Sequence, residues 1–130
     1  MDFSSKLKEA KLIRRYKRFL ADVELADGST LTVHCPNSGS MKSCSDPGSP
    51  VCLSIHDNPK RKYPHTLEMV RIGSSWVGVN TSRTNAIVAE AIQDGIIKEL
   101  PPFDSLKREV KTSPHSRLDI MLESGSRKTY

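Results

Sequence analysis

Two groups of positively charged residues are the first feature of this sequence that could do chemistry. One group lies within residues 14–18, and the other is the triplet at residues 60–62. Lys and Arg at this density neutralise anions, and the phosphates of a nucleic acid are an extended anion that such groups bind. The alternative is that both groups only keep the surface soluble. Two groups on one small domain favour binding, provided that the fold brings them together.

Neutral hydrogen-bond donors lie in the polar, turn-forming loop at residues 36–40. The candidate contact residues are Arg14, Arg15, Lys17, Arg18, Asn37, Ser40, Lys42, Lys60, Arg61 and Lys62. Proteins that bind single strands usually add aromatic stacking platforms, but aromatic residues make up only 5% of this chain. Tyr16, Tyr63 and Trp76 are the candidates, although we expect Phe19 and Trp76 in the core. The scarcity predicts contacts to the phosphate backbone that tolerate any base sequence.

A second candidate for chemistry is Asp119, which lies within the apolar run Leu118–Leu122. A carboxylate in an apolar strand is costly unless it is paired or bound to a metal. Arg117 shares a face with Asp119 under a period of two, so a local ion pair is one interpretation. The other is a metal ligand of a nuclease-type site, with Glu90 as a further carboxylate.

The cysteine and histidine residues raise the question of a zinc site. The chain has three cysteines, an odd number that argues against a closed disulfide framework and favours reduced thiols. His34, His56 and His65 lie near the cysteines in sequence, but the paired spacing of structural zinc sites is missing. The alternative is that Cys35 and Cys52 are small core residues.

The elements that must position these residues begin with an alternating pattern on both sides of Asp27-Gly28, which predicts a β-hairpin over residues 19–35. Further alternating runs predict strands at 51–55, 65–72 and 76–79, whereas residues 1–15 read as a polar, basic lead-in. Five short strands separated by turns indicate a small barrel. With basic loops, such a barrel resembles the oligonucleotide-binding (OB) fold.

The period changes after residue 81 and predicts a second unit. Apolar residues recur near every 3.6 positions from Ser82 to Asp94, with Ser82 or Thr84 as the N-cap and Gly95 as the stop. Two strands are predicted at 106–111 and 117–123, and the tail at 124–130 reads as a turn towards a strand that lies beyond the chain. We therefore expect domains at 1–80 and 81–130.

Composition limits the class of protein. The 130 residues carry 20 Lys and Arg against 15 Asp and Glu, a formal net charge of +5 that favours an anionic partner. The first residues lack the apolar segment of a signal peptide, and no apolar run is long enough to span a bilayer. We expect a cytoplasmic protein that has no membrane partner.

Several motifs jointly resemble one known family. The stretches His34-Cys-Pro-Asn-Ser-Gly-Ser-Met41, Asp57-Asn-Pro-Lys-Arg-Lys62, Val77-Gly-Val-Asn-Thr81 and Ser116-Arg-Leu-Asp119, with residues 14–23, are similar to the sugar fermentation stimulation protein A family. The resemblance implies a β plus α/β fold, in which an N-terminal five-stranded OB-fold barrel precedes a PD-(D/E)xK nuclease-like α/β unit. It also implies sequence-tolerant DNA binding and a regulatory link to sugar (maltose) metabolism. Asp119 falls at the first acidic position of the nuclease motif.

This sequence departs from the family pattern at its C-terminal end. The family continues into a strand with a Glu-x-Lys element, whereas this chain ends at Tyr130. We therefore expect an incomplete second domain that is inactive as a nuclease, holds no cofactor in this chain and self-associates through its uncovered face. Mg²⁺ is the cofactor expected for the complete nuclease-like domain. The alternatives to DNA binding are a metal-dependent nuclease and a module that binds an acidic protein.

Overall fold

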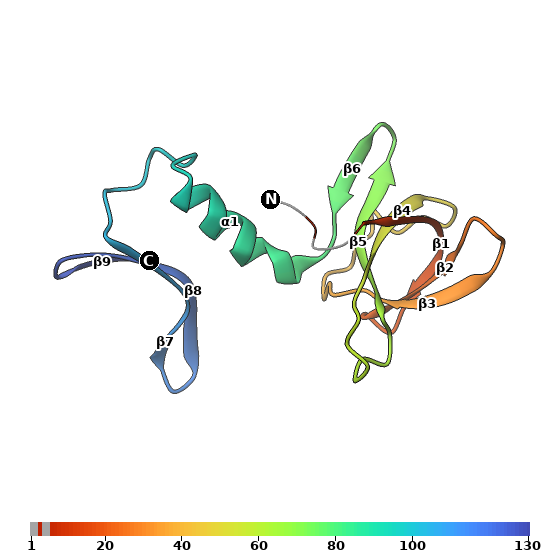
Figure 1. Cartoon of the computed structure of the whole chain (residues 1–130), viewed down its shortest axis with the longest axis horizontal. Helices are drawn as coiled ribbons and strands as arrows, with labels where there is room; N and C mark the ends of the chain where they lie inside the picture. Colours follow the sequence, from red (N-terminus) through yellow and green to blue (C-terminus); the bar gives the residue numbers. More distant parts are fainter. Residues whose placement is uncertain (1–2, 4–5) are drawn as a thin grey trace. The chain divides into compact units, whose positions relative to one another are not determined.

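The computed structural model describes Phe3 and residues 6–130, which form two compact units (Figure 1). The first unit ends at Ser82, and the second runs from Arg83 to Tyr130. No helix within the described residues is long and apolar enough to cross a membrane.

The first unit is a closed five-stranded barrel with one extra strand. Its strands are β1 (Lys8–Tyr16), β2 (Leu20–Glu24), β3 (Thr30–His34), β4 (Pro50–Ile55), β5 (His65–Ile72) and β6 (Ser75–Gly78). They pair in the order β3-β2-β1-β4-β5-β6, and a parallel contact between His34 of β3 and Thr66 of β5 closes the ring. This connectivity is that of an OB fold, in which β6 extends the edge of β5 outside the barrel.

The five strands that form the barrel differ from the predicted five in one respect. The expected basic lead-in contains β1, which pairs with both β2 and β4, whereas the strand predicted at 76–79 is β6 and lies outside the ring. Ala10 and Leu12 of β1 face the core, while Lys11 between them faces water. A register shift follows Leu12, and a bulge of this kind bends a strand; residues 8–11 pair with β4 and residues 11–16 pair with β2. A strand with a hydrated outer face reads in sequence as a polar segment.

The barrel core consists mainly of small and β-branched side chains, which suit a narrow interior. Its fully buried residues are Ala21, Val23, Val33, Cys35, Val51, Leu53, Leu67 and Val70. All three cysteines are free, and Cys35 and Cys52 are buried as the core interpretation expects. The described part of the chain contains no group of three or more His, Cys, Asp or Glu residues that could hold a metal. The structure therefore gives the zinc alternative no support.

The predicted hairpin is confirmed as β2 and β3. Gly28 takes the positive φ of 81° that the turn requires, and the amide of Ser29 donates to Asp27 Oδ1 at 2.9 Å. The chain then closes the turn with a hydrogen bond from the amide of Leu25 to the carbonyl oxygen of Ser29. Local turn chemistry alone accounts for this element.

The second unit consists of one helix and a three-stranded antiparallel sheet. A 3₁₀ turn (Thr81–Arg83) leads into α1 (Thr84–Gln93), and the sheet pairs β7 (Ser105–Ser113), β8 (Ser116–Ser124) and β9 (Arg127–Thr129) in that order. Helix α1 lies against β7 and β8 and buries Ala89 and Ile92 (Figure 1). Both predicted strands are confirmed. The tail is different from the prediction, because it already forms a third strand.

The predictions for the two ends of α1 fare differently, since the C-terminal one is confirmed and the N-terminal one is wrong. Gly95 has a φ of 67°, and its amide and that of Ile96 donate to the carbonyl oxygens of Ile92 and Ala91, which is a Schellman motif and confirms the predicted stop. At the other end, the N-cap is Arg83 and no side chain caps the helix. The prediction of a Ser82 or Thr84 cap is wrong, because the side chain and amide of Ser82 bond to Asn80 instead.

Candidate nucleic-acid interface

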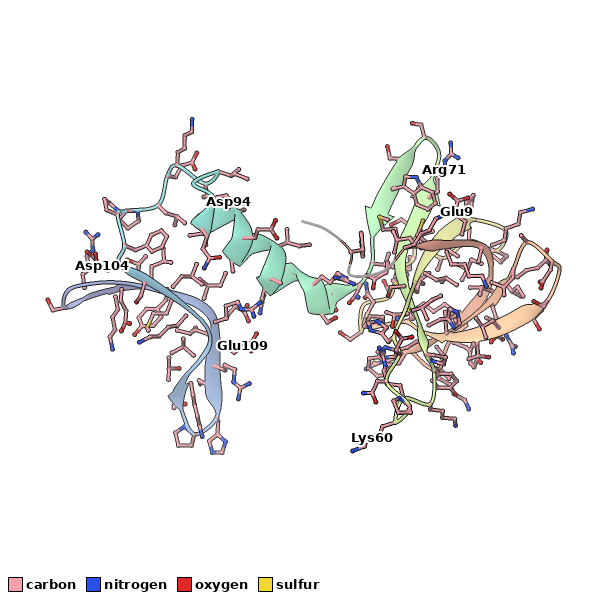
Figure 2. The ribbon with its side chains drawn as sticks, in the orientation of Figure 1. Glu9, Lys60, Arg71, Asp94, Asp104 and Glu109 are labelled. Atoms are coloured by element: carbon pink, nitrogen blue, oxygen red, sulfur yellow. The ribbon has the colours of Figure 1, made fainter. Side chains whose placement is uncertain are left out.

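Two loops at one end of the barrel carry most of the predicted basic residues. The β1–β2 loop (residues 17–19) precedes Leu20, which pairs with His34, and His34 in turn pairs with Thr66. The β4–β5 loop (residues 56–64) reaches the same place, since Arg61 Nη2 donates to Thr66 Oγ1 at 3.2 Å. Figure 2 shows Lys60 at the tip of this loop, away from the end of the barrel where Glu9 and Arg71 lie. We name these two loops together the basic end of the barrel.

The β1–β2 loop is a tight turn with an unusual backbone. Lys17 and Arg18 have φ values of 49° and 61°, in the left-handed region that side chains with a Cβ disfavour. Both side chains are exposed, and the next residue, Phe19, is 48% exposed. The prediction that Phe19 is a core residue is therefore wrong, because β2 begins only at Leu20 and Phe19 belongs to the turn.

The β4–β5 loop is ordered by its own polar groups. The amide of His56 donates to the carbonyl oxygen of Pro64 at 2.9 Å, and the amide of Lys60 donates to Asn58 Oδ1 at 3.0 Å. Lys60 and Lys62 are exposed, and Lys62 Nζ lies 5.5 Å from the centroid of the Tyr63 ring. The loop therefore presents two lysines and one aromatic ring from a defined backbone.

The sequence predicts that Arg15 binds phosphates, but in the structure its guanidinium binds backbone carbonyl oxygens of the protein itself. Its Nη2 donates to the carbonyl oxygens of Arg18 at 2.8 Å, Asn37 at 2.7 Å and Gly39 at 2.8 Å, and Nη1 lies 3.4 Å from that of Ser40. The guanidinium thus joins the β1–β2 loop to the loop after β3. Its charge still contributes to the basic end, but the hydrogen-bond donors of Nη2 are used within the protein.

Asn37 is also used within the protein. Its Nδ2 donates to the carbonyl oxygen of Val79 at 2.9 Å, and its Oδ1 accepts from the amide of Gly39 at 2.8 Å. Ser40 and Lys42 are exposed on the same loop, on either side of the buried Met41. Of the predicted residues on this loop, the side chains of Ser40 and Lys42 therefore face solvent.

Arg14 is exposed but paired with Asp22. Its Nε lies 2.9 Å from Asp22 Oδ2, and its guanidinium lies 4.7 Å from the Tyr16 ring centroid. The hydrogen bond and charge of Asp22 raise the pKa of Arg14. Burial opposes ionisation of Asp22, but hydrogen bonds from Thr32, Arg14 and Tyr16 outweigh it and lower the pKa of Asp22. The pair anchors the outer face of β1 and β2.

A buried carboxylate lies on β5 near the basic end. Glu68 is 2% exposed, and its carboxylate accepts from Ser54 Oγ at 2.6 Å and from Asn80 Nδ2 at 2.9 Å. Ser54 Oγ also lies 3.2 Å from His56 Nε2 at the start of the β4–β5 loop. Glu68 has no partner in the β4–β5 register, which marks it as a bulge residue whose side chain leaves the strand's alternation. The network ties the basic end to the barrel wall.

The opposite end of the barrel has a shallow hollow of about 510 Å³. Its lining includes Glu9, Glu24, Lys11, Arg71 and Trp76, so acidic and basic side chains are mixed there. Trp76 is 41% exposed on β6, which corrects the expectation that it is a core residue. The mixed charge distinguishes this end from the basic end.

In the second unit, Asp119 is exposed and belongs to a small polar cluster. Asn85 Nδ2 donates to Glu109 Oε1 at 2.6 Å and lies 3.1 Å from Asp119 Oδ1. Arg117 Nη1 lies 3.8 Å from Glu109 Oε2, so the arginine pairs with Glu109 and the predicted Arg117–Asp119 pair is replaced. Glu109 reaches this position because its φ of 54° interrupts the regular strand. The sequence offered no signal for it.

Glu90 lies on α1 of the same unit. It lines a hollow beside α1 whose other residues include Leu106 and Arg108. Within the described residues, Glu90 and Asp119 do not belong to a group of three or more metal-ligating side chains.

A closed OB barrel with two basic loops, followed by a helix packed on a three-stranded sheet, defines an OB-fold protein with a second unit of helix and sheet. Two family models match in the same order, the SfsA N-terminal OB domain over residues 13–79 and the sugar fermentation stimulation protein RE domain over residues 82–130. The chain belongs to the sugar fermentation stimulation protein (SfsA) family.

Curated relatives agree with this assignment. A sugar fermentation stimulation protein homolog of Desulfotalea psychrophila is 57% identical over 130 residues, which cover 100% of this chain and 55% of the relative. A homolog of Acidithiobacillus ferrooxidans is 54% identical over 121 residues, which cover 93% of this chain and 52% of the relative. The chain thus spans about half the length of the curated relatives it matches.

A solved structure, described as Pyrococcus furiosus SfsA in complex with Ca²⁺, has the same fold. It matches with a TM-score of 0.81 and 20% sequence identity, covering 98% of this chain and 53% of that chain. At this identity the comparison shows the fold alone.

Proposed function

We propose that the barrel binds DNA at its basic end through phosphate contacts that tolerate any base sequence. The single observation that carries the proposal is that the loops at 17–19 and 56–64 meet beside the His34–Thr66 pair. In OB folds the loops between strands 1 and 2 and between strands 4 and 5 flank the oligonucleotide-binding face. Lys17, Arg18, Lys60 and Lys62 are the exposed contact residues.

The test is fluorescence anisotropy of labelled DNA across a salt series. If four to six phosphates are neutralised, log K falls with log salt at a slope of about −3 to −5. We expect Lys60→Ala/Lys62→Ala to weaken binding and to make the slope less steep by about 1.4 to 1.8. A slope near zero for the wild-type protein would contradict phosphate binding.

A matched control removes the same charge from the other end of the barrel. Lys11→Ala/Arg71→Ala also deletes two positive charges, at the hollow that contains Trp76. We expect this variant to keep nearly the wild-type slope, because its charges lie away from the basic end. Equal losses in the two double variants would mean that net charge, rather than a defined interface, drives binding.

The names of the curated relatives support a proposed regulatory role in sugar use. If DNA binding underlies this role, a strain that carries Lys60→Ala/Lys62→Ala should grow on maltose as a deletion strain does. Full growth of the variant strain would mean that the role in sugar use does not depend on DNA binding.

The second candidate function is a metal-dependent nuclease, and the pairing of Asp119 with Glu109 through Asn85 favours it. The Ca²⁺ in the description of the Pyrococcus furiosus protein is consistent with a cation site in the family. A plasmid-nicking assay with Mg²⁺, comparing the wild-type protein with Asp119→Ala, tests this candidate. Activity that depends on Mg²⁺ and is lost in the variant would establish it, and nicking that persists in the variant would point to a contaminant.

A further inference from the structure

Phe19 is an exposed aromatic side chain at the tip of the β1–β2 hairpin. Its alternation with Ala21 and Val23 predicts an inward position, yet it is 48% exposed in the structure while Ala21 and Val23 are fully buried. Large apolar side chains at a loop tip gain little from folding. A contact made with another molecule would give this exposure a function.

The tip is held in one conformation by several hydrogen bonds. Arg15 Nη2 binds the carbonyl oxygen of Arg18 at 2.8 Å, and the amide of Cys35 donates to the carbonyl oxygen of Phe19 at 2.7 Å. These bonds maintain the positive φ values of Lys17 and Arg18, which are sterically unfavourable for residues with a Cβ. Strained backbone positions persist only where the surrounding structure holds them, and they are common at ligand clamps and similar sites. The ring is therefore presented from a fixed support.

The surroundings of Phe19 combine charge with aromatic rings. Lys17 and Arg18 precede it directly, and the β4–β5 loop adds Lys62 and the ring of Tyr63 at the same end of the barrel. A single strand offers both phosphates and the faces of its bases, whereas a duplex keeps those faces stacked inside. Aromatic platforms between cations suit the single strand.

We propose that Phe19 stacks on a base and that the basic end takes single-stranded nucleic acid in preference to duplex. This inference rests on the proposed function, which requires only phosphate contacts. It changes the expectation drawn from composition, because one well-placed ring supplies a contact that the small number of aromatic residues did not indicate.

The experiment compares oligo(dT) with a duplex of equal length by anisotropy, using variants of Phe19 in the full chain. Stacking on one aromatic side chain corresponds to about a 5- to 150-fold change in affinity. We expect Phe19→Ala and Phe19→Leu to weaken single-strand binding within this range and Phe19→Tyr to retain it. Duplex binding and the salt slope should stay unchanged, since the phosphate contacts remain. Trp76→Ala, which removes an exposed ring from the other end of the barrel, is the matched control and should bind as the wild-type protein does.

A spectroscopic variant gives a readout that a structural role would not change. In Phe19→Trp/Trp76→Phe the only tryptophan lies at the tip, and its fluorescence should fall on addition of oligo(dT) and remain constant on addition of duplex.

The outcomes separate this inference from the proposed function. Wild-type affinity of Phe19→Ala for oligo(dT), with a loss in Lys60→Ala/Lys62→Ala, would overturn stacking and leave phosphate binding intact. Equal weakening of single strand and duplex by Phe19→Ala would also overturn it. Failure of the wild-type protein to bind either nucleic acid at low salt would overturn both proposals.

Discussion

Arg15 gives the sharpest test of the reasoning, because sequence and structure assign it different roles. The sequence predicts a phosphate ligand, whereas the structure shows three hydrogen bonds of 2.7–2.8 Å from Nη2 to carbonyl oxygens of Arg18, Asn37 and Gly39. The informative change is Arg15→Ala. If the guanidinium joins two loops, its removal should destabilise the barrel and leave the number of phosphate contacts unchanged.

The magnitude follows from the bonds that are lost. A hydrogen bond from a charged donor contributes about 1.5–3 kcal/mol. The three acceptors share one nitrogen, and the carbonyls of Arg18 and Gly39 can turn to water, while the contact to Asn37 is partly buried. We therefore expect a loss of about 2–4 kcal/mol in the free energy of unfolding, less than the sum of three bonds. For a unit of this size the corresponding fall in Tm is about 8–30 °C.

The assay is urea and thermal denaturation, followed by a salt series for DNA binding below the lowered Tm. Arg14→Ala is the matched control, because it removes the same side chain one residue earlier. Arg14 is exposed and paired only at the surface, so its loss should cost less stability. Arg15→Lys should recover only part of the loss, since a single ammonium group does not reproduce the fork of the guanidinium.

One result would refute this reasoning. If Arg15→Ala unfolds at the wild-type urea concentration and its salt slope is less steep by about 0.7–0.9, one phosphate contact has been lost. Arg15 would then be a nucleic-acid ligand as the sequence predicts, and its bonds to the loop would open on binding.

Three further predictions concern the barrel. Glu68→Ala removes the carboxylate that accepts from the buried hydroxyl of Ser54 and from Asn80 Nδ2, and it should lower the free energy of unfolding in urea by about 2–4 kcal/mol. A loss near zero would mean that water or His56 Nε2 replaces the carboxylate. Burial, with the positive charge of a nearby arginine, lowers the pKa of His34 in the folded state. The free energy of unfolding should therefore be highest above the unfolded pKa of about 6.5, and it should fall as the pH drops through the lower folded pKa. Urea midpoints between pH 8 and 5 should therefore decline more in the wild-type protein than in His34→Gln, and parallel curves would contradict this assignment. Gly28→Ala should lower the free energy of unfolding by about 1–2 kcal/mol, because its φ of 81° is unfavourable for a residue with a Cβ. Gly78→Ala is the control and should be nearly neutral, because Gly78 has open space around it and no positive φ. Equal losses in the two variants would contradict the role of the positive φ.

Local patterns in the sequence determined the elements whose causes are local. The β2–β3 hairpin follows from Asp27-Gly28 and alternation on both sides, and the end of α1 follows from Gly95. The strands β7 and β8 of the second unit were also predicted, and β8 contains the apolar run Ile120–Leu122. Motifs spread over the chain identified the family, which the comparisons confirm.

Strand β1 shows where local pattern was insufficient. Its inward residues, Ala10 and Leu12, are few and its outward residues are charged, so the pattern alone resembles a polar lead-in. The strand forms because β2 and β4 supply hydrogen-bond partners on both edges. That support comes from segments distant in sequence, which no local window includes.

Some features of the candidate site could likewise be predicted from the sequence, and others only from the structure. The sequence by itself determined which residues carry charge, and so the two basic groups and Asp119 could be proposed from it. Only the tertiary structure decided what each charge contacts: Arg15 meets the carbonyls of the loop after β3, and Asn85 brings Glu109 to Asp119. It also decided that Phe19 faces solvent. The physical reason is that a residue's type fixes what it can bind, whereas chain closure and strand register fix which groups come within hydrogen-bonding distance.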